Sequence, residues 1–351
     1  MNDQPFRLLI ASPIGAEHVE RMRGNAPEGV EIVYEPDLLP PMRYTGDHGG
    51  MPGHTLTSEQ QERWNGLLAS ADALFDFPWN ERGRHPREYA PNVKWIQTTS
   101  AGVGRAAQAM GIQPGELVIS TASGVHARPL AEFVMMALLM GAKEYCRIVR
   151  EQAAHHWERF CSDELSGKTL AIVGAGRVGR EVAKLARAFD MRLVGLTREF
   201  RADRAAELGL DRLYARNELH EMLSEADAIV VCAPHTPDTE NMIGAAEFDL
   251  LKRGVTFVNI GRGQLVDEAA LIEKLRDGTI GFAGLDVFQT EPLPADSPLW
   301  DFPNVIVNPH SASTSHHENG RITDILLHNL HAFIEGRHDD MRNVLDIERM
   351  Y

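Results

Sequence analysis

Short apolar runs alternate with longer amphipathic stretches along most of the chain, and this alternation predicts strands separated by helices. Up to residue 121 the apolar runs predict strands at 7–12, 30–36, 72–78, 93–100 and 117–121. Amphipathic stretches predict a helix at 16–24 and another from Thr57 or Ser58, where a capping-box spacing to Gln60 or Gln61 marks the start. This order is typical of a parallel sheet with helices on both faces.

A second series of the same kind starts at residue 169. Its six expected strands, which suit a doubly wound nucleotide domain, are 169–174, 192–197, 228–233, 255–260, 280–287 and 305–308. Residues 127–142 are apolar almost all round and predict a buried helix at the junction of two domains. Residues 316–337 predict a helix that returns to the first domain, and 37–57, rich in Pro and Gly, predict an unusually long loop.

The composition narrows the class of protein. The chain has 351 residues, enough for two domains, and is 43% hydrophobic and 24% charged, as globular proteins are. No apolar run approaches the roughly 20 residues that span a bilayer, and no secretory signal is visible, so we expect a cytoplasmic protein. The three cysteines have neither disulfide nor zinc-site spacing, and we predict no metal site. A net charge of −15 argues against nucleic-acid and membrane partners but allows a small anionic substrate held by local cations.

Glycines 174, 176 and 179 form the spacing G-x-G-x-x-G between a strand pattern and a helix pattern, in LAIVGAGRVGREVAKLA. In this context they favour a dinucleotide site, because they permit a tight turn under a pyrophosphate. The next strand of such a unit normally ends in an acid that binds the adenosine ribose. Here the strand ends in Thr197 and Arg198, with Glu199 slightly late. The absence of an acid directly at the strand end therefore leaves open which dinucleotide binds.

Polar residues follow three of the later strands. Arg262, Glu291 and His310 each lie past the C-terminal end of a strand, and Asp286 lies near the end of the second one. Because open α/β sheets bind ligands at that edge, we expect the first three side chains to converge on one cleft. The fork of Arg262 can hold a carboxylate, and His310 can transfer a proton near neutral pH while Glu291 orients its ring. A carboxylate clamp, a proton donor and a dinucleotide predict a 2-oxo acid reductase.

These residues lie in segments that resemble the D-isomer-specific 2-hydroxyacid dehydrogenase family. The matching segments are VGAGRVGREVAKLARAFDMRLVG, APHTPDTENMIG, FVNIGRGQLVDEAALIEKLRDGTIGFAGLDVFQTEPLP and NVIVNPHSAS, and TTSAGVGR (98–105) resembles the family's substrate loop. The resemblance implies two doubly wound parallel-sheet α/β domains. A Rossmann domain that binds NAD(P) would cover 123–312, and a smaller, flavodoxin-like substrate-binding and catalytic domain would cover 1–122 and 313–351.

The resemblance also implies roles for individual residues. It makes Arg262, Glu291 and His310 the catalytic set, and Asp286 would bond the nicotinamide carboxamide. The implied substrate-binding residues are Arg262 with Ala101, Gly102 and Val103, whose amides would meet the substrate carboxylate. The implied cofactor-binding residues are Gly174, Gly176, Arg177, Val178, Gly179, Thr197, Arg198, Ala233, Pro234, Thr239, Ile260, Asp286, His310 and Ser313.

Two departures from the family pattern bear on specificity. Thr197 stands where NAD-preferring members carry Asp, and Arg198 follows directly. An arginine bonded to a 2′-phosphate would contribute roughly 1.5–3 kcal/mol, or a 10- to 150-fold preference. NADP(H) is therefore favoured as the cofactor, with NAD(H), bound through Glu199, as the alternative. Gly104 stands where the substrate loop commonly has Asp, which indicates a different support for that loop.

We therefore expect an NAD(P)-dependent D-2-hydroxyacid dehydrogenase that reduces a small 2-oxo acid, with glyoxylate or hydroxypyruvate favoured. The alternatives are a bulkier 2-oxo acid, an inorganic anion such as phosphite, or a non-catalytic dinucleotide-sensing protein similar to the family's corepressors. Members of the family are usually homodimers. Segments 133–141 and 144–160 could form such a contact, although the second could equally be a solvated amphipathic helix.

Overall fold

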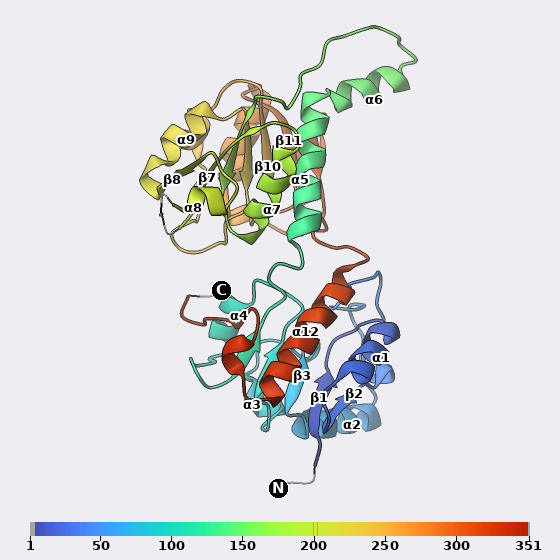
Figure 1. Cartoon of the computed structure of the whole chain (residues 1–351). Helices are drawn as coiled ribbons and strands as arrows, with labels where there is room; N and C mark the ends of the chain where they lie inside the picture. Colours follow the sequence, from blue (N-terminus) through green and yellow to red (C-terminus); the bar gives the residue numbers. More distant parts are fainter. Residues whose placement is uncertain (1–3, 199, 202, 350–351) are drawn as a thin grey trace. The chain divides into compact units, whose positions relative to one another are not determined.

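The computed structural model describes residues 4–198, 200–201 and 203–349. The chain divides into two compact units, here called unit 1 (residues 1–125 and 314–351) and unit 2 (residues 126–313). The division thus falls after Val125 and after Ser313, where the sequence pattern placed it after residues 122 and 312. Each unit has its own sheet (Figure 1). Buried apolar residues form a separate core in each unit.

Unit 1 is built on a parallel sheet of five described strands in the order β2-β1-β3-β4-β5, which is the flavodoxin-like order. The strands are β1 (Phe6–Ile10), β2 (Val30–Val33), β3 (Ala73–Phe75), β4 (Trp95–Gln97) and β5 (Val118–Ser120). The helices are α1 (Ala16–Asn25), α2 (Ser58–Ala69), α3 (Pro86–Tyr89), α4 (Gly104–Ala109) and α12 (Glu318–Ile334). Helix α12 packs beside α1, and its Asn329 Nδ2 donates to Gln97 Oε1 at 3.0 Å, so a buried hydrogen bond joins the C-terminal helix to the sheet.

Unit 2 contains a parallel sheet of seven described strands in the order β12-β11-β10-β9-β6-β7-β8. Counted from β6, this is the Rossmann order with one strand added beyond its sixth. The strands are β6 (Thr169–Val173), β7 (Arg192–Leu196), β8 (Arg212–Tyr214), β9 (Ala228–Val231), β10 (Val255–Asn259), β11 (Ile280–Leu285) and β12 (Val305–Val307). The expected fold class is confirmed, but the expected number of six strands was wrong. Strand β8 was missed because three residues are too few to show a period.

The helices of unit 2 are α5 (Ala127–Ala142), α6 (Tyr145–Ala153), α7 (Arg177–Arg187), α8 (Arg204–Glu207), α9 (Leu219–Glu225), α10 (Ala245–Phe248) and α11 (Glu268–Arg276). Helix α5 has the predicted bounds and packs against α7, β10 and β11. The amphipathic segment 144–160 is helical only over α6, which lies clear of the sheet, and the chain after it forms a turn and an extended loop (Figure 1).

The long loop of unit 1 is tied down by its own side chains. It starts with a 3-10 turn at Pro36–Leu38, and Arg43 binds the buried Asp47 through Nε at 2.7 Å and Nη2 at 2.9 Å. These hydrogen bonds lower the pKa of Asp47 to about 2. Trp79 Nε1 donates to Leu38 O at 3.2 Å, and α2 begins at the capping box between Thr57 and Gln60.

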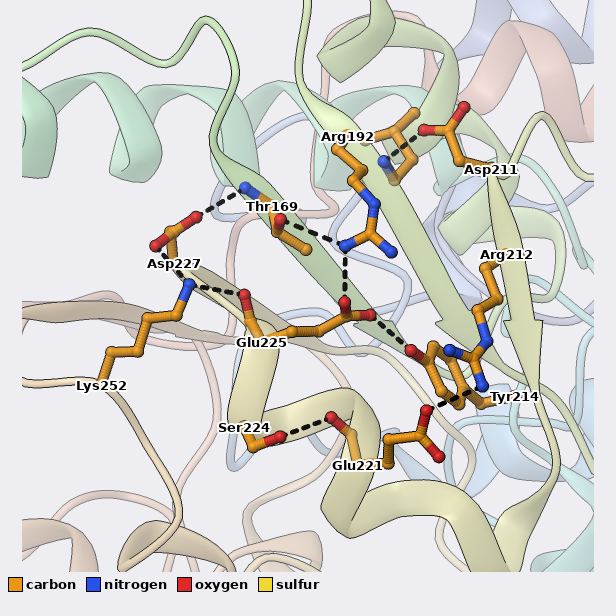
Figure 2. A network of polar contacts seen from close by, with 11 residues as sticks. Thr169, Arg192, Asp211, Arg212, Tyr214, Glu221, Ser224, Glu225, Asp227 and Lys252 are labelled. Atoms are coloured by element: carbon orange, nitrogen blue, oxygen red, sulfur yellow. Dashed lines mark hydrogen bonds and ion pairs between the residues drawn. The ribbon is translucent and has the colours of Figure 1, made fainter.

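Carboxylates anchor the starts of the central strands in unit 2, at the amino-end edge of the sheet (Figure 2). Asp227 accepts from Thr169 N and from Lys252 Nζ, each at 2.8 Å. Glu225 accepts from Arg192 Nη1 at 2.6 Å and from the Tyr214 hydroxyl at 2.5 Å. Burial alone would raise the pKa of Glu225, but these hydrogen bonds outweigh it and hold the pKa below its usual value. This edge is therefore occupied by structural ion pairs.

No helix in the described part of the chain is both long and apolar enough to cross a membrane.

Candidate active site

The glycine turn of unit 2 connects β6 to α7, and its three glycines have different surroundings. Gly174 has φ +101°, and a Cβ there would lie 2.5 Å from Ala233 N. A Cβ on Gly179 would lie 2.8 Å from Gly174 O and 2.9 Å from Ile172 Cγ2, so the helix can approach the strand only without a side chain. A Cβ on Gly176 would meet nothing within 4 Å. Two glycines are thus required by the packing, whereas the third leaves space for a ligand.

That space adjoins the first turn of α7, a helix of 11 residues. The start of a helix carries a positive partial charge that favours an anion, and Arg177 and Val178 form the first turn of α7. Ala233 follows β9, so the turn lies where the strand order of the sheet reverses, between β6 and β9. The residues present therefore fit the pyrophosphate of a dinucleotide.

The end of β7 lies directly beside the glycine turn. The amides of Gly174 and Ala175 both donate to Leu196 O, at 3.0 and 2.9 Å. The next two residues are Thr197, which is buried, and Arg198, which is exposed. They therefore occupy the position predicted for the ribose-binding residues. Glu199 lies outside the described residues.

The other implied cofactor residues line the same edge or its loops. Thr239 Oγ1 donates to Pro234 O at 2.8 Å and closes the loop after β9. Ala233 and Ile260 are buried, and Ser313 is the last residue of unit 2. Cys232 Sγ contacts Gly174 O at 3.1 Å, and burial raises the pKa of this thiol to about 12. The thiol is therefore neutral, and its role is packing.

Arg262, Glu291 and His310 line one cavity of about 520 Å³ in unit 2. They follow β10, β11 and β12, which are neighbours in the sheet, so the expected convergence is found. His310 Nδ1 lies 2.8 Å from Glu291 Oε2, and Glu291 Oε1 accepts from Phe288 N at 3.0 Å. Because a carboxylate accepts at Nδ1, that nitrogen carries the hydrogen, and no described residue bonds Nε2. The remaining lining residues are Gln264, Phe288, Gln289 and Thr290.

The turn that carries Arg262 is held by the side chain of Asn259 and by close contact with the backbone of Phe288. Asn259, buried at the end of β10, accepts from Gly261 N at 3.1 Å and donates to Arg262 O at 3.2 Å. A Cβ on Gly263 would lie 1.9 Å from the backbone of Phe288, so this turn rests on the turn that leads to Glu291. Sequence reasoning missed Asn259, although a polar residue that closes an apolar strand was an available signal.

Gln264 and Gln289 join the same two turns and were also missed. Gln264 Nε2 donates to Gln289 O at 3.1 Å, and Gln289 Nε2 donates to Val266 O at 2.8 Å. Their partners lie 23 to 25 residues away in the chain, so no local pattern could have found them. These two hydrogen bonds connect the segment after Arg262 to the segment before Glu291.

Asp286 is buried and supports the segment that carries His310. Its Oδ1 accepts from Asn308 Nδ2, Ser311 N and Ala312 N at 2.5 to 3.0 Å. Burial raises the pKa of Asp286, and these hydrogen bonds oppose the rise. His310 itself has φ +52°, a left-handed conformation that is uncommon for residues other than glycine. Asp286 therefore supports the turn that carries His310, and its predicted contact with the nicotinamide stays a prediction.

The predicted substrate loop lies in unit 1, between β4 and α4. Ala101 and Gly102 are exposed, and Val103 is buried. In the described chain no acceptor is found for the amides of these three residues. They are available to an anionic ligand.

The family comparison covers the middle of the chain. Residues 134–312 match the model described as "D-isomer specific 2-hydroxyacid dehydrogenase, NAD binding domain". A glyoxylate reductase of Aeropyrum pernix is 32% identical over 82% of this chain and 84% of that enzyme. A glyoxylate reductase of Korarchaeum cryptofilum is 35% identical over 71% of this chain and 75% of that enzyme. A D-3-phosphoglycerate dehydrogenase of Archaeoglobus fulgidus is 30% identical over 88% of this chain but only 54% of that enzyme.

Solved structures agree with the sequence relatives. A D-isomer specific 2-hydroxyacid dehydrogenase family protein from Aeromonas salmonicida has a TM-score of 0.79 at 26% identity, over 98% of this chain and 100% of that one. An NADPH-dependent glyoxylate/hydroxypyruvate reductase from Sinorhizobium meliloti, in complex with NADP and sulfate, has a TM-score of 0.77 at 25% identity, over 99% and 100%. With the glycine turn and the two parallel sheets, these matches show that the chain belongs to the D-isomer specific 2-hydroxyacid dehydrogenase family.

Proposed function

We propose that this protein reduces a small 2-oxo acid, glyoxylate or hydroxypyruvate, to the D-2-hydroxy acid with NAD(P)H. The observation that carries the proposal is the cavity of unit 2, which combines the Arg262 guanidinium with the His310–Glu291 pair. The functions of relatives support this chemistry, since two of the sequence relatives are glyoxylate reductases and one of the similar structures is a glyoxylate/hydroxypyruvate reductase.

In the proposed reaction Arg262 binds the carboxylate of the 2-oxo acid through two parallel hydrogen bonds. Amides of Ala101–Val103 offer further donors to a carboxylate. The bound nicotinamide supplies a hydride for C2 of the substrate. His310 donates a proton from Nε2 to the substrate oxygen, and Glu291 holds the ring by its Nδ1 hydrogen. The hydrogen bond to Glu291 fixes the orientation of the ring, so Nε2 is the nitrogen left to face the substrate oxygen.

We further propose that NADP(H) is preferred over NAD(H). Thr197 presents no negative charge to a 2′-phosphate, and Arg198 lies exposed at the end of β7, beside the glycine turn. A charge-assisted hydrogen bond from Arg198 to that phosphate would contribute roughly 1.5–3 kcal/mol. The complex of the Sinorhizobium meliloti reductase with NADP supports the same cofactor.

The test measures initial rates with NADPH and with NADH, on glyoxylate and on hydroxypyruvate separately. We expect kcat/KM to be at least tenfold higher with NADPH than with NADH. We expect Arg198→Ala to lower kcat/KM with NADPH by roughly 10- to 150-fold, because NADPH binds more weakly, and to leave kcat/KM with NADH unchanged. Arg276→Ala, an exposed arginine of α11 paired with Glu273, serves as the matched control and should change neither rate. An equal rate with NADH would contradict the proposed role of Arg198 in cofactor preference, but not the proposed reduction of a 2-oxo acid. Nucleotide binding without turnover of any 2-oxo acid would instead favour a dinucleotide-sensing protein.

We also propose that the protein is a homodimer joined through unit 2. Tyr145, Ile148 and Val149 share one face of α6, are 42 to 45% exposed, and are followed by Trp157, which is 95% exposed. An apolar face of this kind is typical of a protein contact. Light scattering should give twice the chain mass, and Ile148→Glu with Val149→Glu should give the mass of one chain. A wild-type protein that runs as one chain would exclude the dimer.

A further inference from the structure

Asp76 has an unusual backbone at the carboxyl-end edge of the sheet in unit 1. It follows β3 directly and has φ +67°, a left-handed conformation that costs energy in a residue with a side chain. Its amide donates to Gln97 O at 2.8 Å, so its position is set by the neighbouring strand β4. Strained residues of this kind persist where the surrounding structure holds them, often at functional sites.

The Asp76 carboxylate is bound to the start of the substrate loop. Thr99 Oγ1 donates to Oδ2, and Phe77 N donates to Oδ1 at 2.8 Å. Burial raises the pKa of Asp76, while the Thr99 hydrogen bond and the electrostatic influence of His48 oppose the rise. The side chain is half-buried and both of its oxygens accept a hydrogen bond, so the position of the carboxylate relative to Thr99 is fixed.

The long loop 37–57 supplies His48 to this region. His48 Nδ1 lies 3.0 Å from Pro13 O, and the ring packs edge-on against Phe75, with 6.2 Å between the centroids. The imidazole is thus held by Pro13, which follows β1, and by Phe75 of β3. This part of the long loop is therefore anchored beside the end of β3, where Asp76 lies.

Residues 98–100 are held at several points before the loop opens. Thr98 N donates to Ser120 O at 2.7 Å, Thr98 Oγ1 donates to Ser100 O at 2.8 Å, and Ala122 N donates to Ser100 O at 3.2 Å. Between them the Thr99 side chain reaches Asp76. At the far end Val103 is buried and accepts from Ala107 N at 2.9 Å where α4 begins, and Gly104 has no side chain to add a hydrogen bond. The side-chain hydrogen bonds that hold the loop therefore lie at its near end, at Thr98 and Thr99.

We propose that Asp76 is a positioning residue for the carboxylate-binding amides of Ala101–Val103 and acts through the Thr99 hydroxyl. The inference rests on the proposed function, because it assigns those amides to the carboxylate of a 2-oxo acid. Asp76 touches neither substrate nor cofactor. Its task is to hold the loop so that three amides face the ligand with little loss of conformational freedom on binding.

The test replaces Thr99 by Val, which keeps the shape and removes the hydroxyl, and by Ser, which restores it. We expect Thr99→Val to raise KM for the 2-oxo acid, and the Kd of oxalate measured by calorimetry with NADP⁺ present, by about tenfold. We expect kcat and the Kd of NADPH to change less than about twofold, since ground-state binding alone is lost. Thr99→Ser should return KM to near the wild-type value. Asp76→Asn, which keeps one acceptor oxygen, should fall between the two.

Thr323→Val is the matched control, because Thr323 is fully buried in the same unit and its hydroxyl also donates, to Asn319 O at 2.8 Å. It should leave KM and the oxalate Kd unchanged. Wild-type values of both quantities in Thr99→Val would overturn the inference alone. Equal losses in Thr99→Val and Thr99→Ser would overturn it too, because they would point to packing. A wild-type protein that neither reduces a 2-oxo acid nor binds oxalate would overturn the proposed function, and the inference with it.

Discussion

Replacing His310 by asparagine is expected to lower kcat by roughly 10²- to 10⁴-fold, because the proposed proton donor is lost while the rest of the cavity remains. Asparagine is the appropriate replacement, since His310 has φ +52° and asparagine tolerates this left-handed backbone better than most residues. The variant therefore tests the chemistry of the imidazole and not the strain of the turn. The measurement is kcat at saturating substrate, together with the Kd of NADPH, which should change little.

Two further variants sharpen this result. His220 also pairs with a glutamate, Glu247, at 2.8 Å, but on the surface, so His220→Asn should leave kcat unchanged. Glu291→Gln keeps an acceptor near His310 Nδ1 but removes the charge, and we expect a loss in kcat smaller than that of His310→Asn. A His310→Asn protein with near-normal kcat would mean that another group, or solvent, supplies the proton.

Replacing Arg262 by lysine is expected to lower kcat/KM for a 2-oxo acid by roughly 10- to 150-fold. The ammonium group keeps the charge but cannot reproduce two parallel hydrogen bonds, so about one charge-assisted bond of 1.5–3 kcal/mol is lost. The turn below leaves little room for compensation, because Asn259 holds Arg262 O and Gly263 lies against the backbone of Phe288. The measurement is kcat/KM for glyoxylate and hydroxypyruvate under saturating NADPH.

The control for this variant is Arg276→Lys, which changes the same chemical group on the exposed face of α11 and should have no effect on kcat/KM. Near-normal efficiency in Arg262→Lys would remove the carboxylate clamp from the proposed mechanism. If Arg262→Lys also lowered the thermal midpoint of unfolding well below that of Arg276→Lys, the loss of activity would instead show that Arg262 has a role in folding.

Much of unit 2 was predictable from its sequence because its signals are local. Continuous apolar runs such as 169–174 mark strands buried on both faces, and the spacing of Gly174, Gly176 and Gly179 reports the geometry of a single turn. The same reasoning placed Arg262, Glu291 and His310 past three strand ends. Strand β8 and the early end of α6 were not predicted. A three-residue strand is too short to show a period, and an amphipathic pattern can continue beyond the last helical residue.

Other features depended on partners far apart in the chain. Asp286 was expected to bond the nicotinamide carboxamide, and the structure adds that its Oδ1 accepts from Asn308 and from the backbone of Ser311 and Ala312, next to His310. No sequence pattern around either partner predicts the hydrogen bond from Gln264 to Gln289 or the one from Thr99 to Asp76. They could be seen only once the turns that carry them lay side by side.

By itself, the sequence determined the α/β class, the glycine turn and the polar residues at the strand ends, because backbone geometry ties each of these to neighbours only a few positions away. Tertiary structure decided which of those residues meet. The order β12-β11-β10 makes three separate strand ends adjacent, which brings a guanidinium, a carboxylate and an imidazole to one cavity. It also decided what holds them in place, since the hydrogen-bond partners of His310 and Asp286 come from turns far away in the sequence that the fold places next to them.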